Sequence, residues 1–161
     1  MGNKPLVSIV TRTKNRPVTL QRLLENLTKQ KYKNFEWIIV NDCGSRDYVN
    51  DIRDKALSLG LITKTIHNST SKGRSYPVNL GAEKASGKYM LILDDDDYLH
   101  EDCLLEMVDY VEKYDWLGGV AVHTRVVYEA IDANSIKQIG KGRLYAPKLD
   151  DFLFYNQKLH H

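Results

Sequence analysis

Four consecutive aspartates, Asp94 to Asp97, are the residues of this chain whose types and spacing are best suited to chemistry. They directly follow the apolar residues 89–93, which are typical of a short buried strand. Four carboxylates at one point repel one another unless cations or hydrogen-bond donors offset their charge. Carboxylate oxygens are the ligands that Mg²⁺ prefers, usually one or two of them together with substrate phosphates. The run therefore indicates a metal-assisted phosphate site, or alternatively a solvated acidic turn that caps the next helix.

Length and composition narrow the class of protein. A chain of 161 residues, 42% hydrophobic and 27% charged, is expected to form one globular domain with a sizeable core. With 23 basic and 21 acidic residues the net charge is only +2, which argues against a nucleic-acid partner. No apolar run approaches the ~18 residues of a membrane span, so we expect no span in this chain.

The two cysteines, Cys43 and Cys103, lie far apart without CxxC spacing, which indicates reduced thiols. We therefore expect a cytoplasmic protein. Attachment of the full-length protein to the inner face of the membrane, through a further segment, is an alternative.

Alternating strand and helix patterns are expected to position the aspartates. Apolar and β-branched runs predict five strands, at residues 6–11, 35–40, 61–67, 89–93 and 120–128. Four helices are predicted between them. The first begins at Pro17 and carries a stripe of leucines at helical spacing, Leu20, Leu23, Leu24 and Leu27. The second ends at Gly60 and the third extends from Pro77 to Gly87. Such alternation implies βαβ units and a mostly parallel sheet, an α/β fold.

The pattern is less regular after residue 128. Two short runs, at 136–139 and 143–145, flank a predicted turn at Gly140 to Gly142. An apolar helical fragment is predicted at residues 149–155, where Asp150 and Asp151 are expected to cap the helix.

Polar side chains follow three of the predicted strands. Ligands of open parallel sheets bind outside the carboxyl ends of the strands, where the strand order reverses. The first, second and fourth strands end in residues 13–16, in Asn41 and Asp42, and in Asp94 to Asp97. We expect these groups to meet at one edge and to form a crevice for an anionic ligand bridged by a metal. The competing GxGxxG, GxxxxGK[ST] and HExxH motifs do not occur.

Three ordered motifs are similar to those of a known family. VSIVTRTKNRP at residues 7–17 resembles the VSVIIPTYNRP opening of family 2 glycosyltransferases of the GT-A fold. FEWIIVNDCGSRD at 35–47 resembles their FEVIVVDDGSTD, and the segment ending in LILDDDDYLHED resembles their SAARNxGIxxAxGEYIxFLDDDD. The resemblance covers roughly residues 6–112. It implies a three-layer, Rossmann-like GT-A fold with a mostly parallel sheet, truncated at its C-terminus.

The resemblance also assigns roles. Residues 1–128 would be a nucleotide-sugar-binding domain, and 129–161 the incomplete start of an acceptor-side region. Asp94 and Asp96 of a DXD motif would bind Mg²⁺ or Mn²⁺, and Asp42 would accept a hydrogen bond from the base. The remaining nucleotide contacts would come from Thr13, Asn15, Arg16, Arg74 and Asp95, the last near ribose or diphosphate.

The implied reaction is inverting, metal-dependent transfer of a hexose from a nucleotide diphosphate sugar. A UDP-sugar is the favoured donor, and a saccharide or lipid-linked hydroxyl the acceptor. The general base is expected beyond His161, so the 161 residues should bind donor without transferring sugar, and uncovered apolar surface could cause self-association. Alternatives are a non-catalytic nucleotide-sugar-binding module and a nucleotidyltransferase-like enzyme.

The chain departs from the family pattern at four positions. Arg12 replaces a proline, Lys14 an aromatic residue and Val78 an arginine, and Cys43 is an extra residue in the turn after Asp42. These departures weaken the transfer of individual roles.

Overall fold

The computed structural model describes residues 6–114, 117–122, 124–131 and 135–145. The chain forms two compact units, Met1–Asp102 and Cys103–His161, and each is described by itself. The functional boundary predicted at residue 128 stays a prediction.

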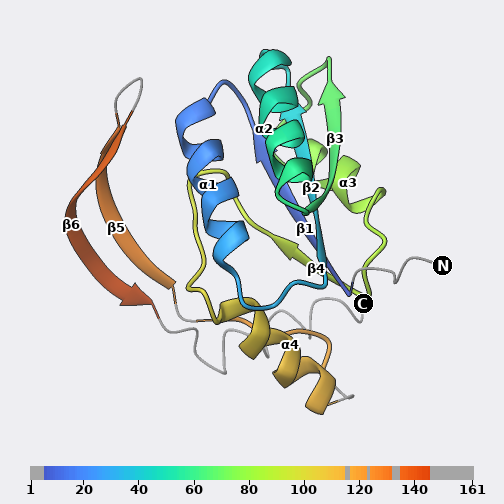
Figure 1. The fold of residues 1–161 in the computed structure, drawn as a ribbon, viewed down its shortest axis with the longest axis vertical. Helices are drawn as coiled ribbons and strands as arrows, with labels where there is room; N and C mark the ends of the chain where they lie inside the picture. The colour runs from blue at the N-terminus through green and yellow to red at the C-terminus, as the bar shows by residue number, and fades with distance from the viewer. Residues whose placement is uncertain (1–5, 115–116, 123, 132–134, 146–161) are drawn as a thin grey trace. The chain divides into compact units, whose positions relative to one another are not determined.

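The first unit is built on a four-stranded sheet, and all of its strand pairs are parallel. Its strands are β1 (Val7–Thr13), β2 (Phe35–Asp42), β3 (Ile62–Asn68) and β4 (Tyr89–Ile92). The order is β3-β2-β1-β4, so β1 lies between β2 and β4 (Figure 1). The strand order therefore reverses at β1, and the carboxyl ends of β1, β2 and β4 are neighbours, as the sequence predicts.

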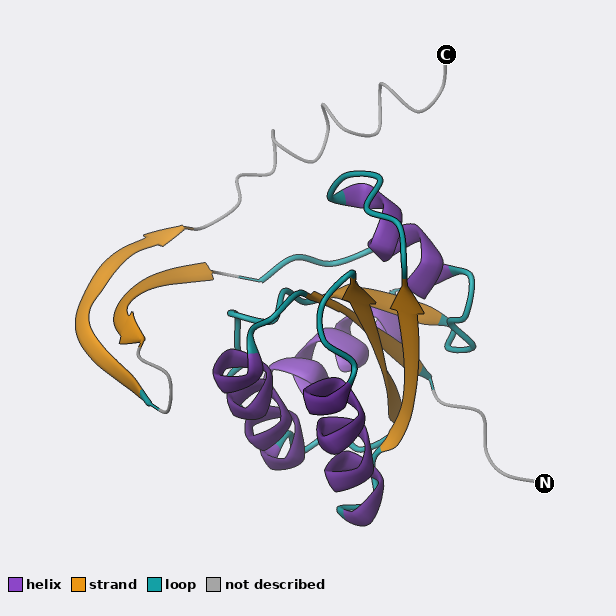
Figure 2. Ribbon diagram, turned by 90° about the horizontal axis from the view of Figure 1, so that it is seen from above, coloured by secondary structure: helices purple, strands orange, loops and turns teal. Residues whose placement is uncertain are grey.

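Helices cover both faces of this sheet. Figure 2 shows α1 (Pro17–Lys29) and α2 (Asp47–Ser58) on one face and α3 (Ser75–Ala82) on the other, which gives three layers. The predicted leucine stripe of α1 is buried, and this helix begins at Pro17 as predicted. Between α3 and the sheet lies a core cluster of Val10, Ile38 and Val40, to which Leu80 contributes. The predicted α/β fold with a mostly parallel sheet is thus confirmed.

A buried carboxylate ties the amino-terminal half of the sheet together. Glu36 Oε1 accepts hydrogen bonds from Ser8 Oγ and from the backbone nitrogen and Oγ of Ser86, each at 2.7 Å. Lys64 Nζ lies 2.6 Å from Glu36 Oε2. Burial favours a raised pKa, but the ammonium and these donors lower the pKa of Glu36 to about 2. The network holds the turn that leads into β4. It thereby helps to set the direction of β4 and of Asp94 to Asp97, which follow that strand.

Two predicted elements of this unit are corrected by the structure. Helix α3 begins at Ser75 and ends at Ala82, instead of extending from Pro77 to Gly87. Proline fits its first turn because no intrahelical bond is lost there. The strand at β4 is shorter than predicted and is not fully buried: Met90 and Ile92 are 50% and 52% exposed. The reason is that β4 is an edge strand of the described sheet, with one unpaired side.

The second unit contains α4 (Cys103–Lys113), β5 (Thr124–Ile131) and β6 (Ile136–Tyr145). The predicted strand at 120–128 begins later, at Thr124, and pairs with β6 in an antiparallel ribbon. The predicted turn at Gly140 is wrong, because residues 136–145 form one strand. Gly140 lies opposite Tyr128, and a Cβ added to this glycine would lie 3.5 Å from the Tyr128 ring.

The predicted helical fragment at 149–155, with Asp150 and Asp151, lies outside the described residues. Among the helices that are described, none has both the length and the apolar character that crossing a bilayer requires.

Candidate functional site

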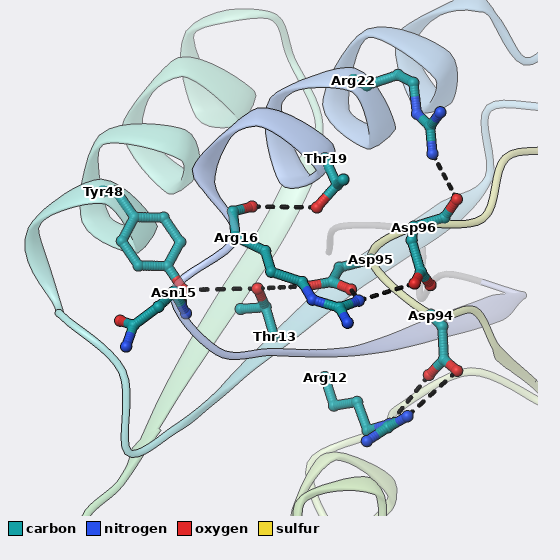
Figure 3. A network of polar contacts seen from close by, with 10 residues as sticks. All are labelled: Arg12, Thr13, Asn15, Arg16, Thr19, Arg22, Tyr48, Asp94, Asp95 and Asp96. Carbon is teal, nitrogen blue, oxygen red and sulfur yellow. Dashed lines mark hydrogen bonds and ion pairs between the residues drawn. The ribbon is translucent and has the colours of Figure 1, made fainter. Parts of the chain in front are cut away.

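The carboxyl ends of β1 and β4 bring an arginine and an aspartate together. Val10 pairs with Ile92 in the β1–β4 register, and Arg12 and Asp94 each lie two residues beyond that pair. Arg12 Nε donates to Asp94 Oδ1 at 3.0 Å and Nη2 to Oδ2 at 3.3 Å, a bidentate fork (Figure 3). The hydrogen bonds to Asp94 raise the pKa of Arg12 above its ordinary value. A residue that departs from the family pattern therefore neutralises one of the predicted metal ligands.

The second aspartate points inward. The side chain of Asp95 is only 5% exposed and accepts a hydrogen bond from Thr13 Oγ1 at 2.7 Å. Arg16 Nη1 lies 3.0 Å from its Oδ1. Burial raises the pKa of Asp95, and the Thr13 hydroxyl and the Arg16 guanidinium lower it in part. Asp95 is thus fixed by donors from β1 and the loop that follows it.

The third aspartate faces solvent and shares the same arginine. Arg16 Nη1 lies 2.8 Å from Asp96 Oδ2, so one guanidinium bridges Asp95 and Asp96 (Figure 3). Arg22 Nη2 donates to the backbone oxygen of Asp96, and its guanidinium stacks over the Tyr98 ring. Burial, together with the neighbouring carboxylates, raises the pKa of Asp97. The predicted acidic cluster is therefore assembled, with arginines as its counter-ions.

The exposed carboxylates at the end of β4 supply part of the ligand set that a divalent ion needs. Asp94 and Asp96 are 41% and 48% exposed, and they present hard oxygen ligands at the carboxyl end of β4. Two carboxylates plus substrate phosphates are a usual Mg²⁺ set. Within the described residues no group of three or more acidic, histidine or cysteine side chains is arranged to hold a metal by itself. The geometry thus suits an ion that arrives with a phosphate ligand.

A second group of polar residues lies at the ends of β2 and β3. Asp42 Oδ1 accepts a hydrogen bond from Asn68 Nδ2 at 2.7 Å, and Oδ2 accepts one from Ser71 Oγ at 3.3 Å. The extra residue Cys43 has a φ of +61°, and its backbone nitrogen donates to the Asn68 oxygen at 3.0 Å. Asn68 therefore fixes both the carboxylate of Asp42 and the turn that follows it.

Asn41 has a different position from its neighbour Asp42. It is buried, and its Oδ1 accepts a hydrogen bond from the Gly44 nitrogen at 3.0 Å. Its Nδ2 lies 3.3 Å from His67 Nδ1, while His67 Nε2 lies 3.1 Å from Asn50 Oδ1. Burial and two nearby arginines lower the pKa of His67, so a neutral ring that accepts at Nδ1 and donates at Nε2 fits these contacts. Asn41 supports the turn, and Asp42 is the carboxylate that the turn presents.

Asn15 joins the two groups. Its φ is +53°, a left-handed conformation that asparagine tolerates. Asn15 Oδ1 accepts a hydrogen bond from the Ser45 nitrogen at 2.9 Å, and its own backbone nitrogen donates to the Tyr48 hydroxyl at 2.8 Å. The loop after β1 is thereby tied to the loop after β2.

Arg74 is not brought into either group. It is exposed at the residue before α3, and within the described residues it forms no hydrogen bond or ion pair. Its predicted nucleotide contact stays a prediction.

Sequence reasoning did not predict five residues that contact the site: Arg12, Arg22, Tyr48, Asn68 and Ser71. The available signal was position. Asn68 and Ser71 follow the third strand as predicted at 61–67, Tyr48 lies in the first turn of the helix after the second strand, and the two arginines lie at the end of β1 and on α1.

The sequence and the fold of this chain resemble those of known proteins. The sequence profile of the family described as "Glycosyl transferase family 2" matches residues 8–158. An uncharacterized glycosyltransferase from Haemophilus influenzae is 36% identical over 99 residues, which are 61% of this chain and 32% of the relative. The chain spans about a third to a half of the length of the curated relatives it matches.

The fold also matches those of solved structures of other proteins. TarS from S. aureus, in complex with UDP-GlcNAc, matches with a TM-score of 0.62 at 26% identity, over 68% of this chain and 32% of the TarS chain. The mannosyltransferase PcManGT from Pyrobaculum calidifontis, in complex with GDP-Man and Mn²⁺, matches with a TM-score of 0.61, over 68% of this chain and 33% of its own. At 20% identity, the second likeness concerns the fold alone.

Proposed function

Because this chain belongs to glycosyltransferase family 2 and has the GT-A fold, we propose that it binds the donor for transfer of a hexose from a nucleotide diphosphate sugar. A UDP-sugar is the proposed donor, and residues 1–128 the proposed donor domain. The observation that carries the proposal is that Thr13, at the end of β1, donates a hydrogen bond to Asp95 beyond the end of β4, while Asp42 ends the neighbouring strand β2. Ligands of such sheets bind at that point.

The nucleoside side of the site is assigned to the loops after β1 and β2. Asp42 is the proposed acceptor for a hydrogen bond from the base, and its carboxylate is held ready by Asn68 and Ser71. Asn15 and Thr13 line the same pocket in this proposal. Carboxylate oxygens can accept more than one hydrogen bond each, so the bonds from Asn68 and Ser71 leave capacity for a base.

The diphosphate side is assigned to the end of β4. Asp94 and Asp96, the outer members of the DXD motif, would hold Mg²⁺ or Mn²⁺, which would offset charge on the departing diphosphate. Asp95 is directed inward by Thr13 and is proposed to lie near ribose or diphosphate. Arg16, already at this point, adds positive charge for the phosphates. The Mn²⁺ and GDP-Man bound by PcManGT support this assignment only through the shared fold.

The acceptor side is a separate part of the proposal. Inverting transfer needs a base that deprotonates a saccharide or lipid-linked hydroxyl, and a positioned base contributes roughly 10²–10⁴-fold. The base predicted beyond His161 stays a prediction. A non-catalytic nucleotide-sugar module would use the same donor site, and the exposed Arg74, which forms no hydrogen bond or ion pair within the described residues, is in keeping with it.

Equilibrium dialysis with a panel of labelled nucleotide sugars tests the donor assignment. We expect UDP-sugars to be retained, and Asp42→Ala to abolish most retention while Asp51→Ala, an exposed change on α2, leaves it intact. Release of the label with and without acceptor then separates a transferase from a binding module. Equal retention by wild type and Asp42→Ala would contradict the proposed base contact.

A further inference from the structure

The Tyr48 hydroxyl lies between two of the proposed donor-site loops. Tyr48 is the second residue of α2, and its hydroxyl accepts the Asn15 N–H at 2.8 Å (Figure 3). The same oxygen is 3.5 Å from Thr13 Oγ1. Thr13 in turn donates to Asp95 at 2.7 Å. One hydroxyl from α2 therefore contacts the end of β1 and the loop that follows it.

The donors and acceptors allow one direction for this chain of hydrogen bonds. The Asn15 backbone nitrogen can only donate, so the Tyr48 oxygen accepts there. An ionised carboxylate only accepts, so Thr13 gives its single hydroxyl proton to Asp95. The Thr13 oxygen is then left to accept from Tyr48, at a distance near the limit of a hydrogen bond. The order is Asn15 to Tyr48 to Thr13 to Asp95, and successive bonds of this kind strengthen one another.

The other end of the chain reaches the turn that presents Asp42. Asn15 Oδ1 accepts the Ser45 N–H at 2.9 Å, and the Ser45 oxygen accepts from Asn41 Nδ2 at 3.0 Å. Asn15 is thus held through its side chain by the turn after β2 and through its backbone by Tyr48. A shift of that turn would move Asn15, and through Tyr48 the hydroxyl that orients Asp95.

We propose that Tyr48 is a positioning residue that couples the base side of the donor site, at Asp42, to the diphosphate side, at Asp95. This inference rests on the proposed function, because it concerns the same donor. Tyr48 itself is not assigned a contact with the nucleotide. Its hydroxyl acts by holding Asn15 in the left-handed conformation and by supplying the proton that the Thr13 oxygen accepts.

The test is UDP affinity in Tyr48→Phe, which removes the hydroxyl and keeps the ring. Loss of one hydrogen-bonding group should weaken UDP binding by about three- to tenfold. Tyr110→Phe is the matched control, since Tyr110 is exposed on α4 and lies in the other compact unit. Thermal melting of both variants shows whether they are folded. If the Tyr48 hydroxyl only stabilised the fold, Tyr48→Phe would lower the melting temperature and leave the UDP affinity of the folded protein unchanged.

Variants of Thr13 make the test specific. In a Thr13→Val background the chain to Asp95 is already broken, so Tyr48→Phe should weaken binding by less than half of its effect in wild type. Thr13→Ser keeps the hydroxyl and should restore the full effect. Should Tyr48→Phe not fold, the Thr13→Val and Thr13→Ser variants are compared with each other: Thr13→Val, which lacks the hydroxyl, should weaken UDP binding more than Thr13→Ser.

The outcomes separate the two proposals. If wild type does not bind UDP, the proposed function falls and this inference with it. If wild type binds UDP, and Tyr48→Phe binds equally well or its effect is the same in the Val and Ser backgrounds, this inference alone is overturned. If Tyr48→Phe does not fold, equal UDP affinity of Thr13→Val and Thr13→Ser overturns the inference about Tyr48.

Discussion

At the scale of single residues, the proposed donor site contains one carboxylate that faces the core and two that face solvent. Asp95 is buried and is held by Thr13 and Arg16, whereas Asp94 and Asp96 remain partly exposed under Arg12 and Arg16. The chemically equal neighbours thereby acquire different roles. In the proposed site the inward carboxylate orients the donor, and a cation binds the outward two only by displacing Arg12 from Asp94 and Arg16 from Asp96.

Arg12 is expected to compete with a divalent ion for Asp94. Its fork occupies both carboxylate oxygens, so Arg12→Ala should raise the affinity for free Mn²⁺ several-fold, because a charge-assisted bond no longer has to be displaced. Electron paramagnetic resonance of Mn²⁺ without nucleotide measures this. Arg53→Ala, which breaks an ion pair with Asp54 on α2, is the matched control. Unchanged Mn²⁺ affinity in Arg12→Ala would show that the fork does not compete.

Asp42→Ala is expected to weaken UDP binding with or without metal. A hydrogen bond to a charged group contributes on the order of 1.5–3 kcal/mol, which is about a tenfold to hundredfold change in affinity. Calorimetric titration in Mn²⁺ and in EDTA should give similar losses. If the folded variant bound UDP with the dissociation constant of wild type, Asp42 would not contact the base. Its role would then be structural, through its hydrogen bonds to Asn68 and Ser71.

The sequence could predict the carboxylates of the site better than their partners. Asp42 and Asp94 to Asp97 follow apolar runs, so their place at a strand end is a local property. The donors to them come from far along the chain, as Arg12 does to Asp94 and Asn68 to Asp42. Which of many polar loop residues meets a given carboxylate depends on strand order and register, and these are properties of the whole sheet.

At the scale of elements, the position of β1 between β2 and β4 creates the site, and α3 packs closely enough to support it. A Cβ on Gly81 would collide with Val10 of β1 and lie 3.2 Å from Val40 of β2. Glycine lets the helix approach both strands directly. The layer of α3 therefore stiffens the two strands that carry Thr13 and Asp42.

Gly81→Ala is expected to destabilise the fold. The added methyl group must push α3 away from the sheet, and overpacking of this kind typically costs about 1–3 kcal/mol. Urea denaturation measures the change in free energy of unfolding. Gly118→Ala is the control, because a Cβ there meets nothing within 4 Å. Equal stability of the two variants would show that α3 can shift without cost.

Helices and strands with a regular pattern of apolar residues could be predicted from the sequence. Features that depend on where an element lies in the sheet could not. The leucine stripe of α1 and the apolar β2 were predicted, because both have one buried pattern along their length. The exposed Met90 and Ile92 of β4 look the same in sequence as buried residues, since edge position follows from strand order. In β6, Gly140 indicates a turn locally, but it pairs with Tyr128 beside an irregularity in the strand register, where a glycine is often found.

At the scale of the whole molecule, stability should depend on acid through Glu36. Its pKa falls from an ordinary 4.5 to about 2 in the folded protein, so the native state favours the ionised form. The stabilisation is fully present above pH 4.5 and is lost as pH falls through 2. Glu36→Gln should therefore lose the part of the acid dependence between these values, whereas the exposed Glu83→Gln should retain it. Urea denaturation across that range is the measurement, and parallel curves for wild type and Glu36→Gln would contradict the assignment.

The central claim is that the edge formed by β1, β2 and β4 binds a nucleoside diphosphate with a divalent ion. Calorimetric titration of UDP into the wild-type chain and into Asp96→Ala, each with Mn²⁺ and with EDTA, tests it most directly. We expect wild type to bind UDP more tightly with Mn²⁺ than with EDTA, and Asp96→Ala to lose most of that difference. Wild type that fails to bind UDP in either condition would contradict the claim, and equal affinity in both conditions would remove the metal from it.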